Sequence, residues 1–231
     1  RLLFFVHGTI GRYDEAVAAA EKVIEHAKAA GDTRMAARGA QGYASVALSG
    51  SLPTSQLIGP CEQLMIDTAG DRKSQAVVAG VLAQLYAMQG DFAKGREFSE
   101  QQRQMLAELG PSVTAWSTSL ERARVELLAG DVEAAERELR ADDAALAALD
   151  ERYFRSTIVA MLAGVLATRG LTEEAEQAVE IARELADEDD VASQVLWRTA
   201  HARLLADAEQ PEAAIEAAER AVEIATEGDD I

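Results

Sequence analysis

The sequence predicts an all-α solenoid, in which antiparallel helix pairs stack into one right-handed superhelix. The first observation is a turn phrase, such as "LAGDVEAAE" from Leu128, that returns every 39 or 40 residues along the chain. A fixed period of this size is typical of repeat proteins, whose units pack on their neighbours. The second is that alanine, the best helix former, is the most frequent residue. The turn positions are Gly11, Gly50, Gly90, Gly130, Gly170 and Glu209.

A second series of turn signals lies half a period from the first, as in "AAGDTR" from Ala29 and "TAGDRK" from Thr68. Between the two series, apolar residues follow helical spacing, for example Val77, Val81 and Leu85. The glycine of a turn ends one helix, and the aspartate that often follows it can cap the next. Each repeat is therefore a hairpin of an A-type helix followed by a B-type helix.

In chain order, "RLLFFVHGTIG" from Arg1 reads as the last turns of an A-type helix. The predicted B-type helices are 13–29, 53–68, 92–108, 132–148, 172–187 and 211–227. The predicted A-type helices are 33–49, 73–89, 113–129, 152–169 and 191–208. The unbroken phase predicts a single solenoid of about six hairpins over residues 1–231. Neither end carries a polar capping face, so we interpret the chain as an excised piece of a longer multidomain protein.

A small residue stands five positions after each turn position, where two helices are expected to approach closely. These residues are Ala16, Ser55, Gly95, Ala135, Ala175 and Ala214. One repeat is irregular, because Pro60 follows Gly59 inside the predicted helix 53–68. A proline inside a helix costs about 3 kcal/mol. We therefore expect this helix to break or kink there, with Pro60 opening a second short helix.

The sequence shows no catalytic or cofactor motif. Phosphate-binding and dinucleotide-binding glycine loops are absent. His7, His26 and His201 fall in different repeats, which a solenoid is expected to keep apart, so we expect no metal site. The acidic run from Thr172 is interpreted as a solvated helix face. We predict that the chain is not an enzyme and holds no metal or cofactor.

Other single residues are interpreted as packing residues. The lone Cys61 excludes an internal disulfide framework and is predicted to be a packing residue instead of a reactive thiol. Trp116 and Trp197 are expected between helices. No apolar run approaches the roughly 20 residues that span a bilayer, and the first residues show no basic region ahead of a cleavage site. We therefore expect a cytoplasmic location by default.

Charge is divided unevenly between the two helix types. The formal net charge is −18, yet the A-type helices sum to a positive charge and the B-type helices to a negative one. Nucleic-acid binding by this segment is not expected, because it needs a clustered basic face. Two interpretations of the A-type arginines stay open. They bind a partner, or they pair with B-type carboxylates.

The turns "QGDF" from Gln89 and "IGRY" from Ile10, each with a small residue in the next turn of helix, resemble the tetratricopeptide repeat. That family has a 34-residue unit, so the longer period here implies longer helices. The family's packing positions match Ala79, Leu82, Ala83 and Tyr86. The next repeat matches poorly, with Ser119, Arg122, Ala123 and Glu126. HEAT-type repeats are the alternative architecture, although the recurring turn phrase argues against them.

The stretch from Glu151 also resembles the helical-repeat region of large bacterial signalling ATPases, where nucleoside-cyclase or DNA-binding modules are attached, and of maltose-regulon-type transcription activators. This resemblance implies a cytoplasmic, bacterial, non-catalytic module in signal transduction or transcription regulation. Its implied partner is a protein or peptide segment, or another domain of the same chain, with no nucleic acid and no membrane. The alternative is a superhelix that senses a small-molecule inducer and controls an attached ATPase, cyclase or DNA-binding domain.

In tetratricopeptide arrays the A-type helices line the concave surface. The resemblance therefore implies that the binding residues lie on these helices. Counted back from the turn positions Gly50, Gly90, Gly130, Gly170 and Glu209, the ninth position of the tetratricopeptide A-type helix falls six residues before each turn. These positions are Ala44, Gln84, Arg124, Gly164 and Arg203. The paired Lys and Asn residues with which some members clamp a C-terminal carboxylate are absent from these positions. The candidate binding residues are Gln41, Gln84, Glu121, Arg124 and Arg203.

Overall fold

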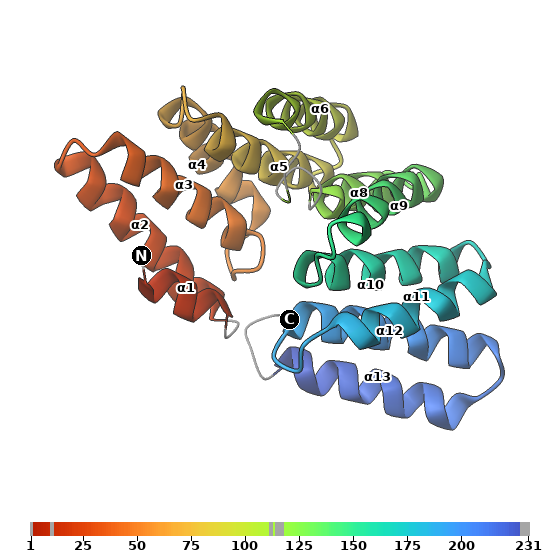
Figure 1. Ribbon diagram of the computed structural model, residues 1–231. Helices are drawn as coiled ribbons and strands as arrows, with labels where there is room; N and C mark the ends of the chain where they lie inside the picture. The colour runs from red at the N-terminus through yellow and green to blue at the C-terminus, as the bar shows by residue number, and fades with distance from the viewer. Residues whose placement is uncertain (1, 10–11, 111–112, 114–117, 227–231) are drawn as a thin grey trace. The chain divides into compact units, whose positions relative to one another are not determined.

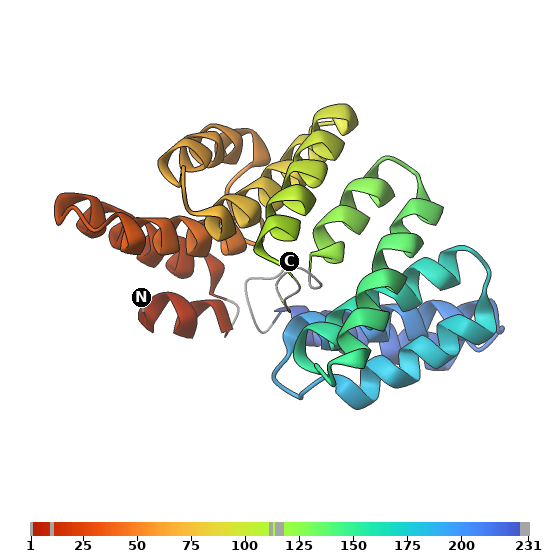
Figure 2. The same ribbon diagram turned by 45° about the horizontal axis from the view of Figure 1, so that its top comes forward.

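The computed structural model describes residues 2–9, 12–110, 113 and 118–226. Within these residues it contains twelve α-helices and no strand, which confirms the all-α prediction (Figures 1 and 2). None of the described helices is long and apolar enough to cross a membrane. The chain divides into two compact units, described in turn below. The prediction that residues 1–231 form one continuous solenoid stays a prediction.

The first unit contains six helices that alternate between the A and B types. They are α1 (Leu2–Thr9), α2 (Tyr13–Ala29), α3 (Thr33–Ala47), α4 (Thr54–Asp67), α5 (Arg72–Met88) and α6 (Phe92–Leu109). Helices that follow one another in the chain pack together, and α5 also packs on α3. The second and third hairpins are therefore in direct contact through their A-type helices α3 and α5, whereas the first hairpin contacts α3 through its B-type helix α2.

The second unit repeats this arrangement. Its helices are α8 (Ser119–Leu128), α9 (Val132–Ala148), α10 (Tyr153–Thr168), α11 (Thr172–Leu185), α12 (Val191–Asp207) and α13 (Pro211–Thr226). The predicted helix 113–129 is described continuously from Thr118 onward, and Trp116 lies outside the described residues. All other predicted helix ends fall within two residues of the observed ends.

The Gly-Asp turns cap the helices on both sides, as predicted. Gly90 has a φ of 83°, and the Asp91 side chain accepts a hydrogen bond from the Lys94 backbone N–H at 3.0 Å. Left-handed backbone favours glycine, which has no Cβ to clash. Glu209 adopts a φ of 58° although it carries a side chain. The aspartate cap forms again at Asp32, Asp71, Asp131 and Asp190.

The small residue predicted at close helix contacts is buried in five of the six repeats. These five are Ala16, Gly95, Ala135, Ala175 and Ala214. Ser55 is exposed, so the prediction is wrong in its repeat. The reason is a longer loop, which runs to Pro53 at the N-cap of α4. The buried face of α4 is consequently displaced along the chain, to Leu57, Cys61 and Leu64.

Helix α4 continues through Gly59 and Pro60, so the predicted break there is wrong. Gly59 has no Cβ, which removes part of the clash that disfavours helical backbone before a proline. Pro60 cannot donate to the Gln56 carbonyl, but both residues are exposed, so water can bind this group. The buried face of α4 stabilises the helix by packing, which outweighs the local cost.

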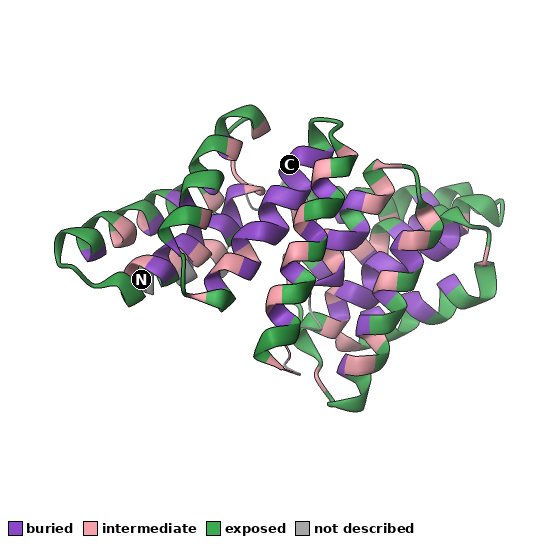
Figure 3. Cartoon of the chain, turned by 90° about the horizontal axis from the view of Figure 1, so that it is seen from above, coloured by how far each residue is buried: buried purple, intermediate pink, exposed green. Residues whose placement is uncertain are grey.

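Cys61 and Trp197 are packing residues, as predicted. Cys61 is fully buried, and burial raises the pKa of its thiol to about 12. The reactive thiolate is therefore scarce at neutral pH. Trp197 is buried, and its Nε1 donates to Gln194 Oε1 at 3.1 Å. Figure 3 shows that buried and exposed positions alternate along the helices, as expected for helices that bury one face.

Candidate functional site

Two of the five predicted binding residues lie in the first unit. Gln41 is on α3 and partly buried, whereas Gln84 is on α5 and buried. The Gln84 Nε2 donates to the Gly80 carbonyl at 3.4 Å, one turn earlier in its own helix. Ala44, the equivalent position on α3, is fully buried. The exposed side chains of the predicted set, Arg124 and Arg203, are therefore found in the second unit.

Three predicted residues lie in the second unit, on two A-type helices. Glu121 and Arg124 are one turn apart on α8, and Arg124 is exposed. Arg203 is exposed on α12, where its Nε lies 3.9 Å from the Asp207 carboxylate. The structure thus brings Glu121 and Arg124 together and places Arg203 on a separate helix.

Arg203 reaches from α12 to the neighbouring helix α10. Its Nη1 donates to Thr168 Oγ1 at 3.0 Å, and this hydroxyl donates to the Gly164 carbonyl at 2.9 Å. A Cβ placed on Gly164 would meet no heavy atom within 4 Å. The surface above Gly164 is therefore open, with the Arg203 guanidinium beside it. We refer to Gly164, Thr168 and Arg203, together with the exposed Arg124 on the preceding A-type helix α8, as the arginine strip.

Other arginines of the second unit pair with carboxylates of the B-type helix α9. Arg122 Nε lies 2.7 Å from Glu138, and Arg155 Nε lies 2.8 Å from Asp143. Arg169, at the C-cap of α10, contacts Glu133 at 3.2 Å and also Glu136. The interpretation that these arginines pair with carboxylates of a B-type helix is therefore confirmed for Arg122, Arg155 and Arg169. These arginines are also less exposed than Arg203.

Glu121 is the one carboxylate among the five predicted residues, and burial perturbs it. Its Oε2 is buried and lacks a hydrogen-bond partner among the described residues. Burial raises the pKa of Glu121 to about 7, although Arg124 and Arg122 oppose this shift. Asp142 on α9 raises it further. Asp142 is itself buried and accepts a hydrogen bond from the Ser119 N–H at 2.8 Å.

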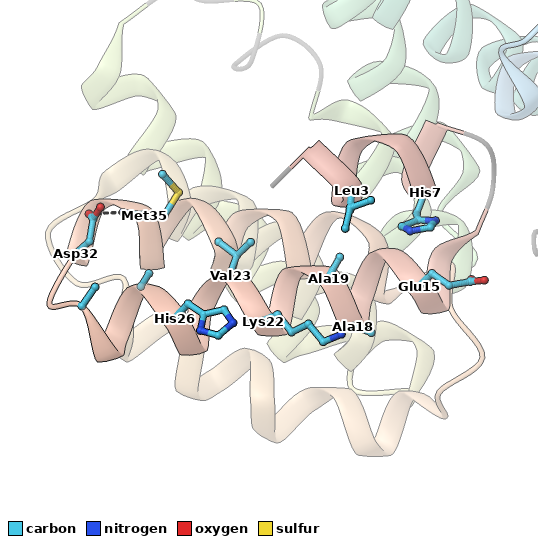
Figure 4. A pocket seen from close by; sticks show the side chains of 12 residues that line it. Leu3, His7, Glu15, Ala18, Ala19, Lys22, Val23, His26, Asp32 and Met35 are labelled. Carbon is cyan, nitrogen blue, oxygen red and sulfur yellow. Dashed lines mark hydrogen bonds between the residues drawn. The ribbon is translucent and has the colours of Figure 1, made fainter.

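Sequence reasoning missed an open groove of about 680 Å³ in the first unit. Figure 4 shows that α1 lies over the N-terminal half of α2, with Leu3 and His7 directed toward that helix. Val23 and Met35 continue the groove beyond α1. The groove is lined by Leu3, His7, Glu15, Ala18, Ala19, Lys22, Val23, His26, Ala27, Ala30, Asp32 and Met35.

Two of the three histidines, expected in different repeats, lie along this one groove. His7 and His26 line the same groove because α1 and α2 pack directly on each other. Among the described residues, no three His, Cys, Asp or Glu side chains could hold a metal ion together. The apolar period of helix 13–29 was the available signal, but it does not distinguish a covered face from an open one.

The fold resembles that of several solved repeat proteins. BtubC (BKLC) from P. vanneervenii matches with a TM-score of 0.68 at 16% identity, covering 93% of this chain and 91% of that one. Two structures of a Podosopora anserina protein assigned to the kinesin light chains, with nearly identical TPR-like repeats, also match. Their TM-scores are 0.51 and 0.50 at 20% identity, covering 90% of this chain and 94% of theirs.

No protein-family profile matches the chain, and no curated protein matches its sequence. The identities to the solved structures are low, so the likeness establishes the fold and nothing finer. The TPR-like repeats of the two Podosopora anserina structures agree with the helix pairs and Gly-Asp turns described above. The chain therefore has a tetratricopeptide-like helical-repeat fold.

Proposed function

We propose that this chain is a non-catalytic, cytoplasmic protein-interaction module of a bacterial signalling or transcription-regulatory protein. Its arginine strip binds an anionic segment of a partner protein or of another domain of the same chain. The observation that carries the proposal is the open surface above Gly164, next to the exposed Arg203. The tetratricopeptide-like fold supports a protein-interaction role.

The chemistry of the strip favours a carboxylate-bearing partner. Guanidinium groups donate paired hydrogen bonds that match the geometry of carboxylates. Glycine in a helix interior costs about 1 kcal/mol relative to alanine. Gly164 leaves room for a backbone or side chain of the partner to lie against α10. A role in binding would explain why a glycine stands here in spite of its cost to the helix. The neighbouring Thr168 hydroxyl adds a polar group at the same surface.

Binding of short, fluorescein-labelled peptides rich in aspartate and glutamate tests the proposal by fluorescence anisotropy. The double variant Arg124→Ala, Arg203→Ala should bind about tenfold more weakly, since two charge-assisted contacts are removed. Gly164→Leu should weaken binding by filling the open surface. The loss should be larger at low salt, where screening is small.

The matched control is Arg72→Ala, because Arg72 is an exposed arginine of the first unit that pairs with Glu108 at 2.9 Å. It should leave peptide binding unchanged. If the double variant lowers the melting temperature by several degrees with binding intact, the two arginines are structural and the proposal fails.

The second candidate function is sensing of a small-molecule inducer that controls an attached ATPase, cyclase or DNA-binding domain. The same strip would hold an anionic effector between its guanidinium groups. A ligand that binds only the folded state raises its stability in proportion to the logarithm of its concentration. Thermal-shift screening against anionic metabolites and nucleotides separates the candidates. A shift that is lost in Gly164→Leu supports sensing at this site.

A further inference from the structure

Helix α10 begins with two exposed aromatic residues. Tyr153 is 61% exposed and Phe154 is 39% exposed, and their rings lie edge to face with centroids 5.2 Å apart. Leu149, at the C-cap of α9 in the same turn, is 49% exposed. Exposed apolar side chains that follow one another in this way are typical of interaction sites. The α9–α10 turn therefore presents a small apolar patch to solvent.

The fold does not require aromatic residues at the start of an A-type helix. The first two residues are Thr33 and Arg34 in α3, Arg72 and Lys73 in α5, and Val191 and Ala192 in α12. In α10 the helix start is capped by Glu151, whose carboxylate accepts a hydrogen bond from the Phe154 backbone N–H at 3.0 Å. The backbone is thus satisfied without the rings, so the two rings are available for contact with another molecule.

Carboxylates of two neighbouring turns lie close to Tyr153. The hydroxyl of Ser156, in the first turn of α10, donates to Asp190 of the α11–α12 turn at 3.1 Å. Partial burial raises the pKa of the Tyr153 phenol, and nearby carboxylates raise it further. These carboxylates belong to Asp190, Asp189 and Glu151. The α11–α12 turn therefore lies beside the aromatic pair.

The charge of these two turns is strongly negative. Residues 149–152 and 186–190 carry six carboxylates and one arginine, Arg152. The Arg152 Nη2 donates to the Glu184 carbonyl at 2.9 Å. Three consecutive carboxylates are exposed and form no ion pair with any described residue, at Asp187, Glu188 and Asp189. The aromatic pair is therefore bordered by negative charge that the described part of the chain does not neutralise.

We propose that these two turns bind a lysine- or arginine-rich segment of a partner protein. A cation is attracted to the electron-rich face of an aromatic ring. Neighbouring carboxylates attract the same cation and steer its approach. Both features of the surface therefore select positive charge, whereas nucleic acids and anionic membranes are repelled. We call this surface the aromatic–acidic edge, which comprises Glu151, Tyr153, Phe154, Asp187, Glu188 and Asp189.

The aromatic–acidic edge lies inside the array of repeats. Its two turns belong to the middle hairpin of the second unit and the one that follows, with α8 and α9 before them in the chain and α12 and α13 after them. Repeats stack only on their nearest neighbours. A further repeat at either end of the chain would thus pack on other helices and leave the edge open.

The edge is also separate from the arginine strip, and the proposal does not rest on the function proposed for that strip. Tyr153 and Thr168 stand at opposite ends of α10, about 22 Å apart along its axis at 1.5 Å per residue. The two surfaces have opposite charge preferences, so a cationic peptide tests the edge alone.

Fluorescence anisotropy with short fluorescein-labelled peptides tests the proposal at low salt. A peptide of alternating lysine and serine should bind the 231-residue chain, and one with glutamine in place of lysine should not. The double variant Tyr153→Leu, Phe154→Leu keeps apolar side chains but removes the ring faces. It should bind the lysine peptide about fivefold more weakly.

The double variant Glu188→Gln, Asp189→Asn removes two charges from the edge and should weaken binding about tenfold, with a larger effect at low salt. The matched control is Glu173→Gln, Glu176→Gln, which removes the same charge from the exposed face of α11. This control should leave binding nearly unchanged. Circular dichroism should show equal helix content in all variants.

Equal losses in the two charge-removing variants would mean that the peptide responds only to the net charge of −18, and would refute the proposal. Unchanged binding in the leucine variant would refute the role of the rings. Equal binding of the glutamine peptide would indicate an apolar partner and refute the selection of positive charge. If the leucine variant loses helix, the Glu188 and Asp189 substitutions still decide the question, because they alter a turn.

Discussion

Glu209 adopts the left-handed backbone that Gly90, Gly130 and Gly170 adopt at the equivalent turns. A side chain in this conformation costs about 1–2 kcal/mol, because its Cβ crowds the backbone. A glycine at this position would lose more chain entropy on folding, which would offset part of the stability gained by relieving the strain. The turn between α12 and α13 therefore stores strain that a glycine would relieve.

Replacing Glu209 with glycine should stabilise the fold by about 0.5–1 kcal/mol, the difference between relieved strain and added chain entropy. Chemical denaturation followed by circular dichroism measures this change. Ala208→Gly is the matched control, because Ala208 has a φ of −85° and gains nothing from glycine. Ala208→Gly should lower stability, and a rise in both variants would contradict the strain argument.

Glu121 makes stability depend on pH. Its folded pKa of about 7 lies above the ordinary 4.5 of a glutamate. The folded chain thus holds the proton more tightly, and stability falls as pH rises between these two values. The Glu121→Gln variant has no such proton. It should lose this dependence, so that its stability relative to the unaltered chain is higher at pH 8 than at pH 5 by roughly 3 kcal/mol.

Unfolding by denaturant at both pH values measures this difference. Glu138→Gln serves as a comparison, since Glu138 pairs with Arg122 on the same pair of helices. Breaking that ion pair should destabilise the chain at both pH values. A constant difference between Glu121→Gln and the unaltered chain at every pH would show that Glu121 is ionised throughout.

Two helix glycines show how element packing decides the effect of a single methyl group. A Cβ on Gly39 of α3 would lie 2.8 Å from Ile24 Cγ1 and 3.2 Å from the Ile24 backbone N, both on α2. At Gly164 of α10 the space is open. Both glycines stand inside A-type helices, so replacing either one by alanine has a comparable effect on helix propensity. The two positions differ in the space around them.

Gly39→Ala should destabilise the fold by about 1–3 kcal/mol, because α2 and α3 must move apart. Gly164→Ala should stabilise it by up to about 1 kcal/mol, because alanine is the better helix former. Denaturant unfolding compares the two. Equal effects would mean that the close approach of α2 and α3 is not a constraint.

Element positions were largely predictable, because their signals are local. The Gly-Asp turns and the apolar period specify where α2, α9 and α12 begin and end. Contacts distant in sequence were not predictable. Pro60 stays helical because α4 packs against α5, and Ser55 is exposed because a loop is longer than in the other repeats.

At the scale of the whole molecule, the candidate site was predicted only in part. The helical register identified Arg124 and Arg203 as exposed residues of A-type helices, but it also selected the buried Gln84. Burial depends on which helices cover a position, and one sequence does not show this. The α1–α2 groove and the carboxylate environment of Glu121 were missed for the same reason.

The Gly-Asp turns have a consequence for how such a chain changes in length. At Gly90 and at Gly130 the turn makes its own caps, since Asp91 and Asp131 each bind a backbone N–H three residues on. Neither cap requires a distant residue. Deleting or duplicating the 40 residues between these equivalent turns would leave both helix ends intact. Length can therefore change by gene duplication in whole hairpins, without the invention of a new connection.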